Sequence, residues 1–141
     1  MGGINGLTTL TSQDGKLVLY SDNNLSLNVY NISTKTADTI GVRTLTEKCV
    51  WGRANDALYC AVPKFIPSAL YPDSWYKGGI SFSDDIWKID LKTGNTNIIA
   101  NPESIEGSEE IDGIKLALDA DENYLFFVNK KDSYLWKLNL K

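Results

Sequence analysis

The sequence predicts an all-β repeat protein made of three consecutive antiparallel meanders, the last of which lacks its fourth strand. The first observation is a strand that recurs with its register kept. Residues 85–94 read DIWKIDLKTG, residues 134–140 read YLWKLNL, and residues 27–34 carry a weaker copy, LNVYNIST. The second observation is that short runs rich in Val, Ile, Leu, Tyr and Trp alternate with Asp-Gly, Asn-Asp and Thr-Gly turns. The third is that no window shows a helical period of 3.6. Together these features indicate a repeat architecture.

The first unit covers about residues 7–40. Asp14 and Gly15 tolerate the positive φ of a tight hairpin turn, and polar residues at 22–24 and 33–36 separate the later strands. The expected strands are residues 7–11, 17–21, 27–32 and 37–40.

The second unit covers about residues 48–100 and repeats this order. Its turns are expected at residues 54–56 and 92–95, and a long insertion at 63–84 separates its second and third strands. The expected strands are residues 48–52, 57–62, 86–91 and 96–100.

The third unit covers about residues 114–140. Its strands are expected at 114–118, 124–128 and 134–140, and the sequence stops at Lys141 before any fourth strand. The three units together make residues 1–141 one half-propeller unit, because consecutive four-stranded meanders are typical of β-propeller blades.

A family resemblance rests mainly on residues 86–94, IWKIDLKTG, which follow an apolar strand and a loop. This pattern resembles the blades of TolB-like propellers, the PD40 type related to WD repeats, over essentially the whole chain. The Ser-Pro-Asp-Gly turn of that family is represented by residues 12–15, SQDG. The first unit departs from the pattern, with Asn28 in place of Trp and Lys35 in place of Gly. The resemblance implies a ring of six blades and an extracytoplasmic parent protein.

Three blades cannot close a ring, since propellers of this kind need roughly four to eight. An open arc would expose apolar blade faces and an unpaired edge strand. The favoured expectation is a homodimer that forms a six-bladed ring, with a nine-bladed trimer or a stable monomer as the minor alternatives. The start, Met1-Gly2-Gly3, also favours an excised or engineered piece of a longer propeller, and the two expectations are compatible.

Composition excludes several functional classes. The net charge is −4, which leaves no basic patch for nucleic acid. No run approaches a membrane span, and the first residues do not resemble a signal peptide. The chain has no histidine, which removes Ser/His/Asp and Cys/His catalysis and His-based zinc sites. We therefore expect no catalytic residues, no metal and no cofactor.

Two cysteines, Cys49 and Cys60, flank the turn predicted near residue 55. The favoured interpretation is a pair of buried thiols. A cross-strand disulfide is the alternative, and it is geometrically demanding.

Two segments are candidates for ligand binding. The insertion carries aromatic residues stiffened by prolines, which could stack on a flat ligand or instead form a small satellite core. Residues 101–113 form an acidic loop without a balancing cation in the sequence, which could attract a cation or a basic partner or could be a solvated loop. Both lie on the same face of a propeller. The candidate ligand-binding residues are Phe65, Tyr71, Trp75, Tyr76, Glu109 and Glu110.

The remaining motifs favour structure over chemistry. Trp87 and Trp136 stand at matching repeat positions and are expected to pack between blades. Asp84 and Asp85 are adjacent in a strand and point to opposite faces, which argues against an acid/base pair and for a role at the strand entrance.

Two functions remain open at this stage. The leading hypothesis is a non-enzymatic, self-associating propeller scaffold with a protein- or ligand-binding face. The alternative is an accessory propeller portion of a larger peptidase or glycosidase. The chain itself has no Gly-x-Ser-x-Gly nucleophile motif and no candidate base.

Overall fold

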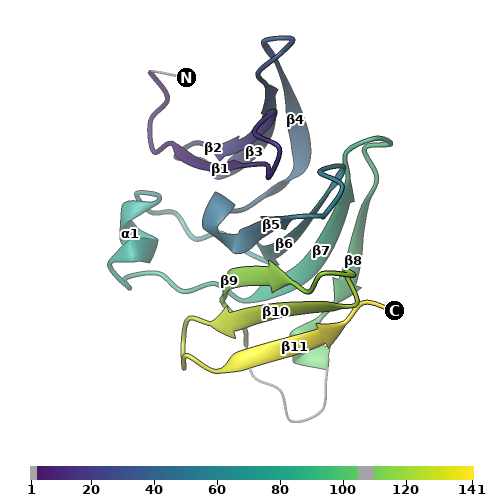
Figure 1. The fold of residues 1–141 in the computed structure, drawn as a ribbon. Coiled ribbons are helices and arrows are strands. Elements are labelled where there is room, and N and C mark those ends of the chain that lie inside the picture. Colours follow the sequence, from purple (N-terminus) through teal and green to yellow (C-terminus); the bar gives the residue numbers. More distant parts are fainter. Residues whose placement is uncertain (1–2, 105–109) are drawn as a thin grey trace.

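The computed structural model describes residues 3–104 and 110–141. Figure 1 shows three antiparallel sheets side by side, with the sheet of the middle blade between the other two. Blade 1 consists of β1 (Thr8–Thr11), β2 (Leu17–Ser21), β3 (Ser26–Asn31) and β4 (Thr36–Arg43). Blade 2 consists of β5 (Cys49–Trp51), β6 (Ala57–Pro63), β7 (Asp84–Asp90) and β8 (Thr96–Ala100). Blade 3 consists of β9 (Gly113–Leu118), β10 (Tyr124–Asn129) and β11 (Leu135–Asn139).

Every blade is a meander in which strands adjacent in sequence pair antiparallel. The prediction of three four-stranded meanders with an incomplete last one is therefore confirmed. The outermost strand of blade 1 ends later than the sequence suggests, because β4 extends to Arg43. Among the described residues, no helix has the length and apolar character of a membrane span.

The blades are joined by two apolar interfaces, and β6 contributes to both. All of its side chains are buried. Leu58, Cys60 and Val62 pack towards blade 1. Tyr59 and Ala61, at the alternate positions, pack towards blade 3. A strand covered on both faces reads as a continuous apolar run, which explains the sequence of residues 57–62.

Cys49 and Cys60 form a disulfide, so the favoured expectation of two buried thiols is wrong. The two residues lie directly opposite each other in the register of β5 and β6. The disulfide lies in the interface between blades 1 and 2, where both sulfur-bearing residues are buried.

Helical structure is confined to short connecting turns in the part of the chain that the structure describes. The insertion contains one turn of helix, α1 (Asp73–Tyr76). Single 3₁₀ turns, η1 (Thr46–Lys48) and η2 (Pro102–Ser104), precede β5 and follow β8. The insertion leaves the blade at Lys64 and returns at Ser83, whose carbonyl accepts a hydrogen bond from the Lys64 amide at 2.9 Å.

Candidate functional site

The insertion folds into a small apolar cluster at one end of the blades, where α1 lies in Figure 1. Tyr71, Trp75 and Phe82 of the insertion are buried in this cluster. Leu25, between β2 and β3, and Leu45, between β4 and η1, are buried against them. The rings of Trp75 and Phe82 stack at 6.5 Å, and the Tyr71 and Phe82 centroids are 5.8 Å apart. The aromatic residues therefore cover the inter-blade junction as a satellite core.

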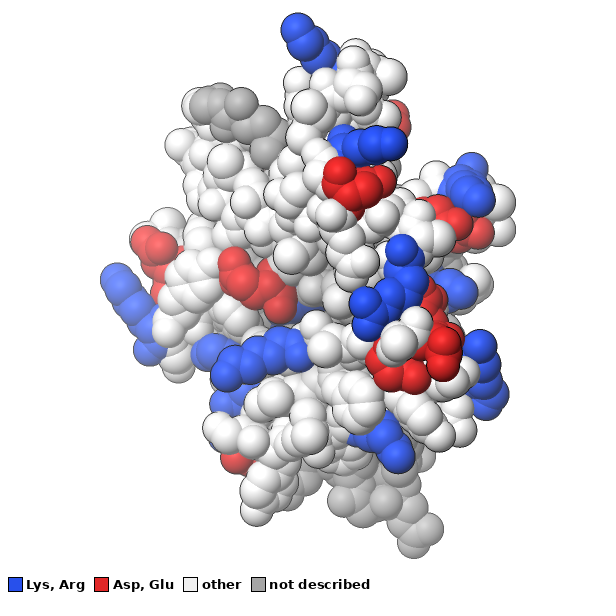
Figure 2. Space-filling model, viewed as in Figure 1, with Lys and Arg blue, Asp and Glu red and all other residues white. Residues whose placement is uncertain are grey.

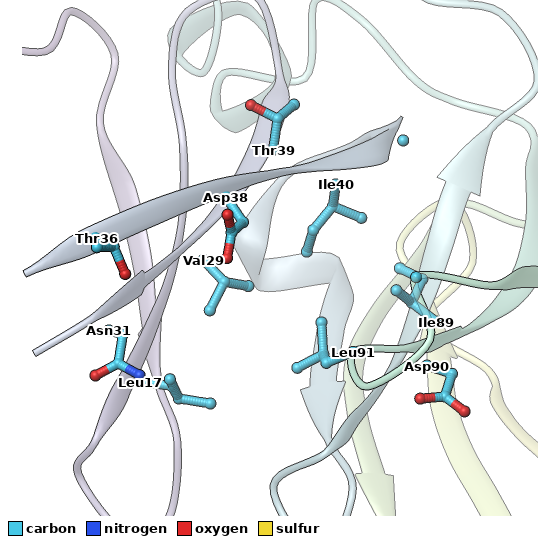
Figure 3. Close-up of a pocket in the computed structure, with 12 residues that line it drawn as sticks. Leu17, Val29, Asn31, Thr36, Asp38, Thr39, Ile40, Ile89, Asp90 and Leu91 are labelled. Atoms are coloured by element: carbon cyan, nitrogen blue, oxygen red, sulfur yellow. The ribbon is translucent and has the colours of Figure 1, made fainter. Parts of the chain in front are cut away.

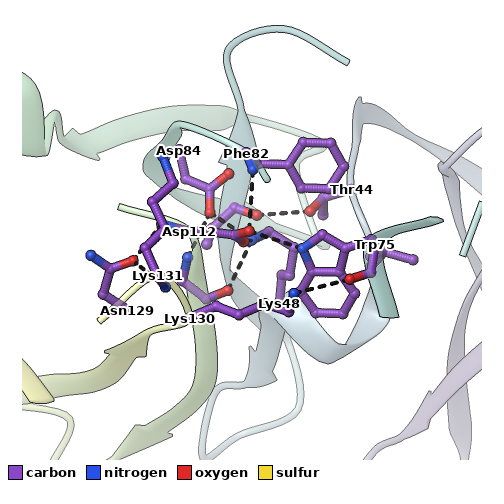
Figure 4. Close-up of polar contacts among 12 residues, drawn as sticks. Thr44, Lys48, Trp75, Phe82, Asp84, Asp112, Asn129, Lys130 and Lys131 are labelled. Atoms are coloured by element: carbon purple, nitrogen blue, oxygen red, sulfur yellow. Dashed lines mark hydrogen bonds and ion pairs between the residues drawn. The ribbon is translucent and has the colours of Figure 1, made fainter. Parts of the chain in front are cut away.

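Beneath this cluster a single cation, Lys48, lies fully buried between two carboxylates (Figure 4). Its Nζ is 2.6 Å from Oδ2 of Asp84 and also pairs with Oδ1 of Asp112. It donates a further hydrogen bond of 3.0 Å to the carbonyl of Gly113. The ammonium lies 5.4 Å from the ring centroids of both Trp75 and Phe82. Buried charges persist only when they are paired and hydrogen-bonded in this way.

Asp112 links the insertion to blade 3. Its Oδ2 accepts hydrogen bonds from Nε1 of Trp75 at 2.9 Å and from the amide of Phe82 at 3.1 Å. Its own amide donates to Oδ1 of Asn129 at 3.0 Å. Lys130 adds a second link, because its Nζ donates to the Trp75 carbonyl at 2.9 Å. The Asp112 carboxylate thus connects Lys48 of η1 to the insertion, and the Asp112 amide adds the link to the end of β10.

Asp84, the other carboxylate, begins β7 and is fully buried. Its Oδ2 accepts a hydrogen bond of 2.7 Å from the amide of Gly113 as well as the Lys48 ion pair. Burial raises the pKa of Asp84 to about 6, and Lys48 opposes this shift. Its Oδ1 and the hydroxyl of Thr46 have no hydrogen-bond partner among the described residues. One buried carboxylate oxygen without a hydrogen bond therefore lowers the net stabilisation that the cluster provides.

This polar cluster, defined by Lys48, Asp84 and Asp112, is closed to solvent, since all three side chains have no exposed surface. No substrate atom can reach it in this conformation. Within the described ranges, no group of three potential ligands has the arrangement of a metal site. The role of the cluster is therefore structural: it joins two blades and the insertion.

The acidic segment is paired with lysines wherever the structure describes it. Glu103 accepts hydrogen bonds from Lys64 at 2.7 Å and Ser83 at 2.6 Å, and these bonds lower the pKa of Glu103. Glu110 pairs with Lys131 at 2.8 Å. The interpretation of this segment as a solvated acidic loop is therefore wrong at Asp112, which is buried against Lys48. Lysines that are distant in the sequence therefore balance the negative charges of this segment.

The candidate ligand-binding residues divide into two groups. Tyr71 and Trp75 are buried in the satellite cluster, whereas Phe65 is 74% exposed and Tyr76 is 51% exposed. The Tyr76 hydroxyl donates to Glu47 at 2.7 Å, and desolvation together with this bond raises the pKa of Tyr76. Glu110 is exposed. Glu109 lies outside the described residues.

Trp87 and Trp136 each lie on the face of their blade that packs against the preceding blade. Trp87 is partly buried against the cluster between blades 1 and 2. Trp136 is partly buried against the cluster between blades 2 and 3, where its ring stacks on Phe127 at 6.3 Å.

Sequence reasoning missed the Lys48–Asp84–Asp112 cluster because its members are far apart in the chain. One signal was available: Lys48 and Asp112 each stand immediately before the first strand of a blade. First strands of consecutive blades are neighbours, and β5 and β9 are in contact here. Opposite charges at equivalent positions of neighbouring blades therefore predict a pair.

Figure 2 shows charges of both signs interspersed over the viewed face, with no large patch of either sign. On the insertion, the exposed aromatic side chains among the described residues are Phe65 and Tyr76.

Comparisons with known proteins identify the fold alone. A scan against models of protein families finds no match, and a search of the curated proteins finds none. Among solved structures, the chain is similar to hydrazine synthase of Kuenenia stuttgartiensis, with a TM-score of 0.62 and 15% identity over 92% of this chain and 38% of that one. It is similar to an oligogalacturonate lyase in complex with manganese, with a TM-score of 0.62 and 16% identity over 95% of this chain and 38% of the lyase.

A third similar structure is the tricorn protease, with a TM-score of 0.59 and 11% identity. That match covers 86% of this chain and 11% of the protease. The chain therefore spans much less than half the length of each of these β-propeller proteins. The three antiparallel meanders and these neighbours together show that the chain folds as consecutive blades of a β-propeller.

Proposed function

We propose that this chain is a non-enzymatic, TolB-like propeller scaffold whose two end faces associate head to tail, so that two copies close a six-bladed ring. The observation that carries this proposal concerns matching repeat positions in different blades. Several positions on blades 1 and 3 are exposed, whereas the equivalent positions in blade 2 are buried. The insertion end of the ring would then present a protein- or ligand-binding face around Phe65, Tyr76 and Glu110.

The tail face is the outward face of blade 3, and it includes Phe126, Val128 and Leu135. The strand registers align these positions with Tyr59, Ala61 and Ile86 of blade 2. Those three residues are buried against blade 3. Phe126 and Val128 are only half-buried, and Leu135 is 69% exposed. Blade 3 thus carries the apolar surface of an inter-blade contact without a following blade.

The head face is the outward face of blade 1, and it includes Tyr20, Tyr30 and Ile32. The registers align Tyr30 with Ile89, which is buried between blades 1 and 2. Tyr30 is half-buried, and Ile32 is 47% exposed. Within the described residues, no blade packs against this face of blade 1, and none packs against the tail face of blade 3.

A second copy of the chain supplies both missing surfaces at once. Each internal interface joins a tail-type face of one blade to a head-type face of the next. The head face of one copy is therefore the counterpart of the tail face of another, and two such contacts close a ring of six blades, within the usual range for propellers. The outer edge of β11, which has no neighbouring strand among the described residues, would also lie at this junction.

The test is the solution mass by light scattering coupled to size-exclusion chromatography, over a range of concentrations. We expect a species at twice the chain mass. Leu135→Asp should shift this species to the monomer, because it places a charge in the closing interface. Leu70→Asp is the matched control: Leu70 is 80% exposed but lies on the insertion, so this variant should remain a dimer.

A monomer at every concentration would overturn self-association and favour closure by further blades of a longer chain. A trimer would keep head-to-tail closure but replace the six-bladed ring with a nine-bladed one. Equal effects of Leu135→Asp and Leu70→Asp would show that the tail face is not the contact.

A further inference from the structure

The apolar interface between blades 1 and 2 opens at its outer side into a cleft of about 340 Å³ (Figure 3). We call it the first inter-blade cleft. Leu17, Val29 and Ile40 form the blade 1 wall, and Ile89 and Leu91 form the blade 2 wall. Asp38 from β4 and Asp90 from the end of β7 also line it. The described lining contains two carboxylates and no Lys or Arg.

The repeat places an equivalent cleft between blades 2 and 3, the second inter-blade cleft. Its walls include Leu138 and Leu140, which match Ile89 and Leu91 of the first cleft in the strand repeat. Ile99 follows the residue paired with Trp87, as Ile40 follows the residue paired with Asn28 at the equivalent position. The space in the second cleft is about 140 Å³, and a neighbouring pocket of about 310 Å³ in the same junction shares Tyr59, Lys88 and Leu140 with it. The two clefts therefore share a framework and differ in the residues that line them.

An exposed lysine side chain borders the second cleft. Lys88 lines it, and its Nζ lies 5.7 Å from the ring centroid of Tyr59. Val29 stands at the Lys88 position in blade 1, since Val29 pairs with Leu19 and Lys88 with Tyr59 at matched registers. Exchanging a lysine for a valine removes both the long aliphatic stem and the ammonium group. The first cleft thus lacks the lysine that borders the second.

The same comparison shows two added negative charges in the first cleft. Asp38 matches Asn97, because each pairs with the residue at the Val29/Lys88 position. Asp90 matches Asn139. The second junction therefore has two neutral amide side chains where the first junction has two carboxylates. The described lining of the first cleft contains no lysine.

Both carboxylates keep unused hydrogen-bond acceptor capacity within the described residues. Asp38 is exposed and has no hydrogen bond or ion pair within the described ranges. Asp90 accepts backbone hydrogen bonds from Lys92 at 2.9 Å and Thr93 at 3.3 Å through Oδ1, and these bonds lower its pKa. The acceptor capacity of the other Asp90 oxygen is not used by these turn contacts.

We propose that the first inter-blade cleft binds a primary ammonium group carried on an unbranched aliphatic stem. The stem would lie against Leu17, Ile40 and Leu91, and the ammonium would lie near Asp38 and Asp90, as the chain's own Lys88 borders the equivalent cleft. Such a group comes either from a lysine of a partner protein or from a free alkyl diamine. The site lies within one copy of the chain, so it does not depend on ring closure.

The experiment is a titration followed by two-dimensional NMR of the labelled chain. The probes are 1,5-diaminopentane and a capped Gly-Lys-Gly peptide, and the control probe is a capped Gly-norleucine-Gly peptide, which has the stem without the charge. We expect saturable shifts of the Val29, Ile40 and Leu91 methyl signals with at least one amine probe, and none with the control. Asp38→Asn, which copies Asn97, should weaken binding by roughly two- to fivefold, as for an exposed ion pair.

Val29→Lys is the decisive variant, because it restores the lysine of the second cleft and should abolish binding. Asp121→Asn, a matched removal of an exposed carboxylate in blade 3, should leave binding unchanged. Binding of the diamine alone would assign a free amine, and binding of the peptide would assign a protein lysine. No saturable binding, binding of the norleucine control, or binding unaffected by both Val29→Lys and Asp38→Asn would overturn the proposal.

Discussion

Ile86 and Leu135 occupy the same position in consecutive blades, yet Ile86 is fully buried and Leu135 is 69% exposed. Each is the residue of the third strand that faces the following blade. Ile86 has blade 3 against it, and Leu135 faces the open end of the arc. The difference in burial is therefore set by the neighbouring blade and not by the residue type.

This relationship predicts different effects for two similar substitutions. Ile86→Ala should lower the free energy of unfolding by about 2–5 kcal/mol, since it leaves a cavity in a closed interface. Leu135→Ala in dilute protein should change it by less than about 0.5 kcal/mol. Urea unfolding at low concentration measures both. A loss for Leu135→Ala as large as that for Ile86→Ala in the monomer would contradict the assignment.

The buried cation predicts a large destabilisation on truncation. Lys48→Met should lower the free energy of unfolding by about 3–5 kcal/mol, because it leaves Asp84 and Asp112 without their shared counter-ion. Lys88→Met, which changes an exposed lysine, is the control and should have a small effect. A triple variant, Lys48→Met with Asp84→Asn and Asp112→Asn, should recover part of the loss. Equal stability of Lys48→Met and the parent would rule out a structural role for the pair.

Asp84 predicts a specific dependence of stability on pH. Its pKa of about 6 in the folded chain lies above the ordinary value of 3.8, so the folded state binds more protons between these values. The contribution of Asp84 to the free energy of unfolding therefore grows as the pH falls from about 7 towards 4, and is lost as the pH rises through 6.

Unfolding curves at several pH values check this sign against variants. Relative to Asp84→Asn, the parent should gain on the order of 1 kcal/mol between pH 7 and pH 5. A parent profile parallel to that of Asp84→Asn would show that Asp84 has an unshifted pKa.

The disulfide between Cys49 and Cys60 predicts a loss of stability on reduction. The bond closes a short loop, with a sequence separation of 11, and should contribute about 2–3 kcal/mol. Alkylation with and without a reductant, followed by mass spectrometry, tests its presence, and unfolding of Cys49→Ala/Cys60→Ala tests its contribution. Alkylation of both thiols in unreduced, unfolded protein would contradict the disulfide.

The close approach of β9 to β6 predicts that Gly113 cannot be replaced without a compensating change. A Cβ at Gly113 would lie 2.9 Å from the Cβ of Ala61. Gly113→Ala should therefore cost about 1–3 kcal/mol, and adding Ala61→Gly should restore part of it. Gly41→Ala, which has open space around the new methyl group, is the control. Additive effects of Gly113→Ala and Ala61→Gly would contradict the predicted contact.

The sequence by itself determined the strands and their order. Alternation of apolar residues and the Asp-Gly, Asn-Asp and Thr-Gly turns are local signals, so the meanders and the register shared by Leu27, Ile86 and Leu135 could be read directly. It also located the insertion and its aromatic residues. It did not determine which of them are exposed, since Trp75 and Tyr76 are adjacent and only the docking of α1 buries one of them.

Only the tertiary structure decided the contacts between residues distant in the chain. Lys48 meets Asp112 because the starts of blades 2 and 3 converge, and it meets Asp84 because β5 and β7 begin at the same end of blade 2; no local pattern records these meetings. The same holds for the two inter-blade clefts: Val29 and Lys88 occupy one repeat position, but only the packing of a neighbouring blade makes each of them the wall of a cleft. Periodicity fixes which face a residue points to, and the three-dimensional arrangement of the blades fixes what it meets there.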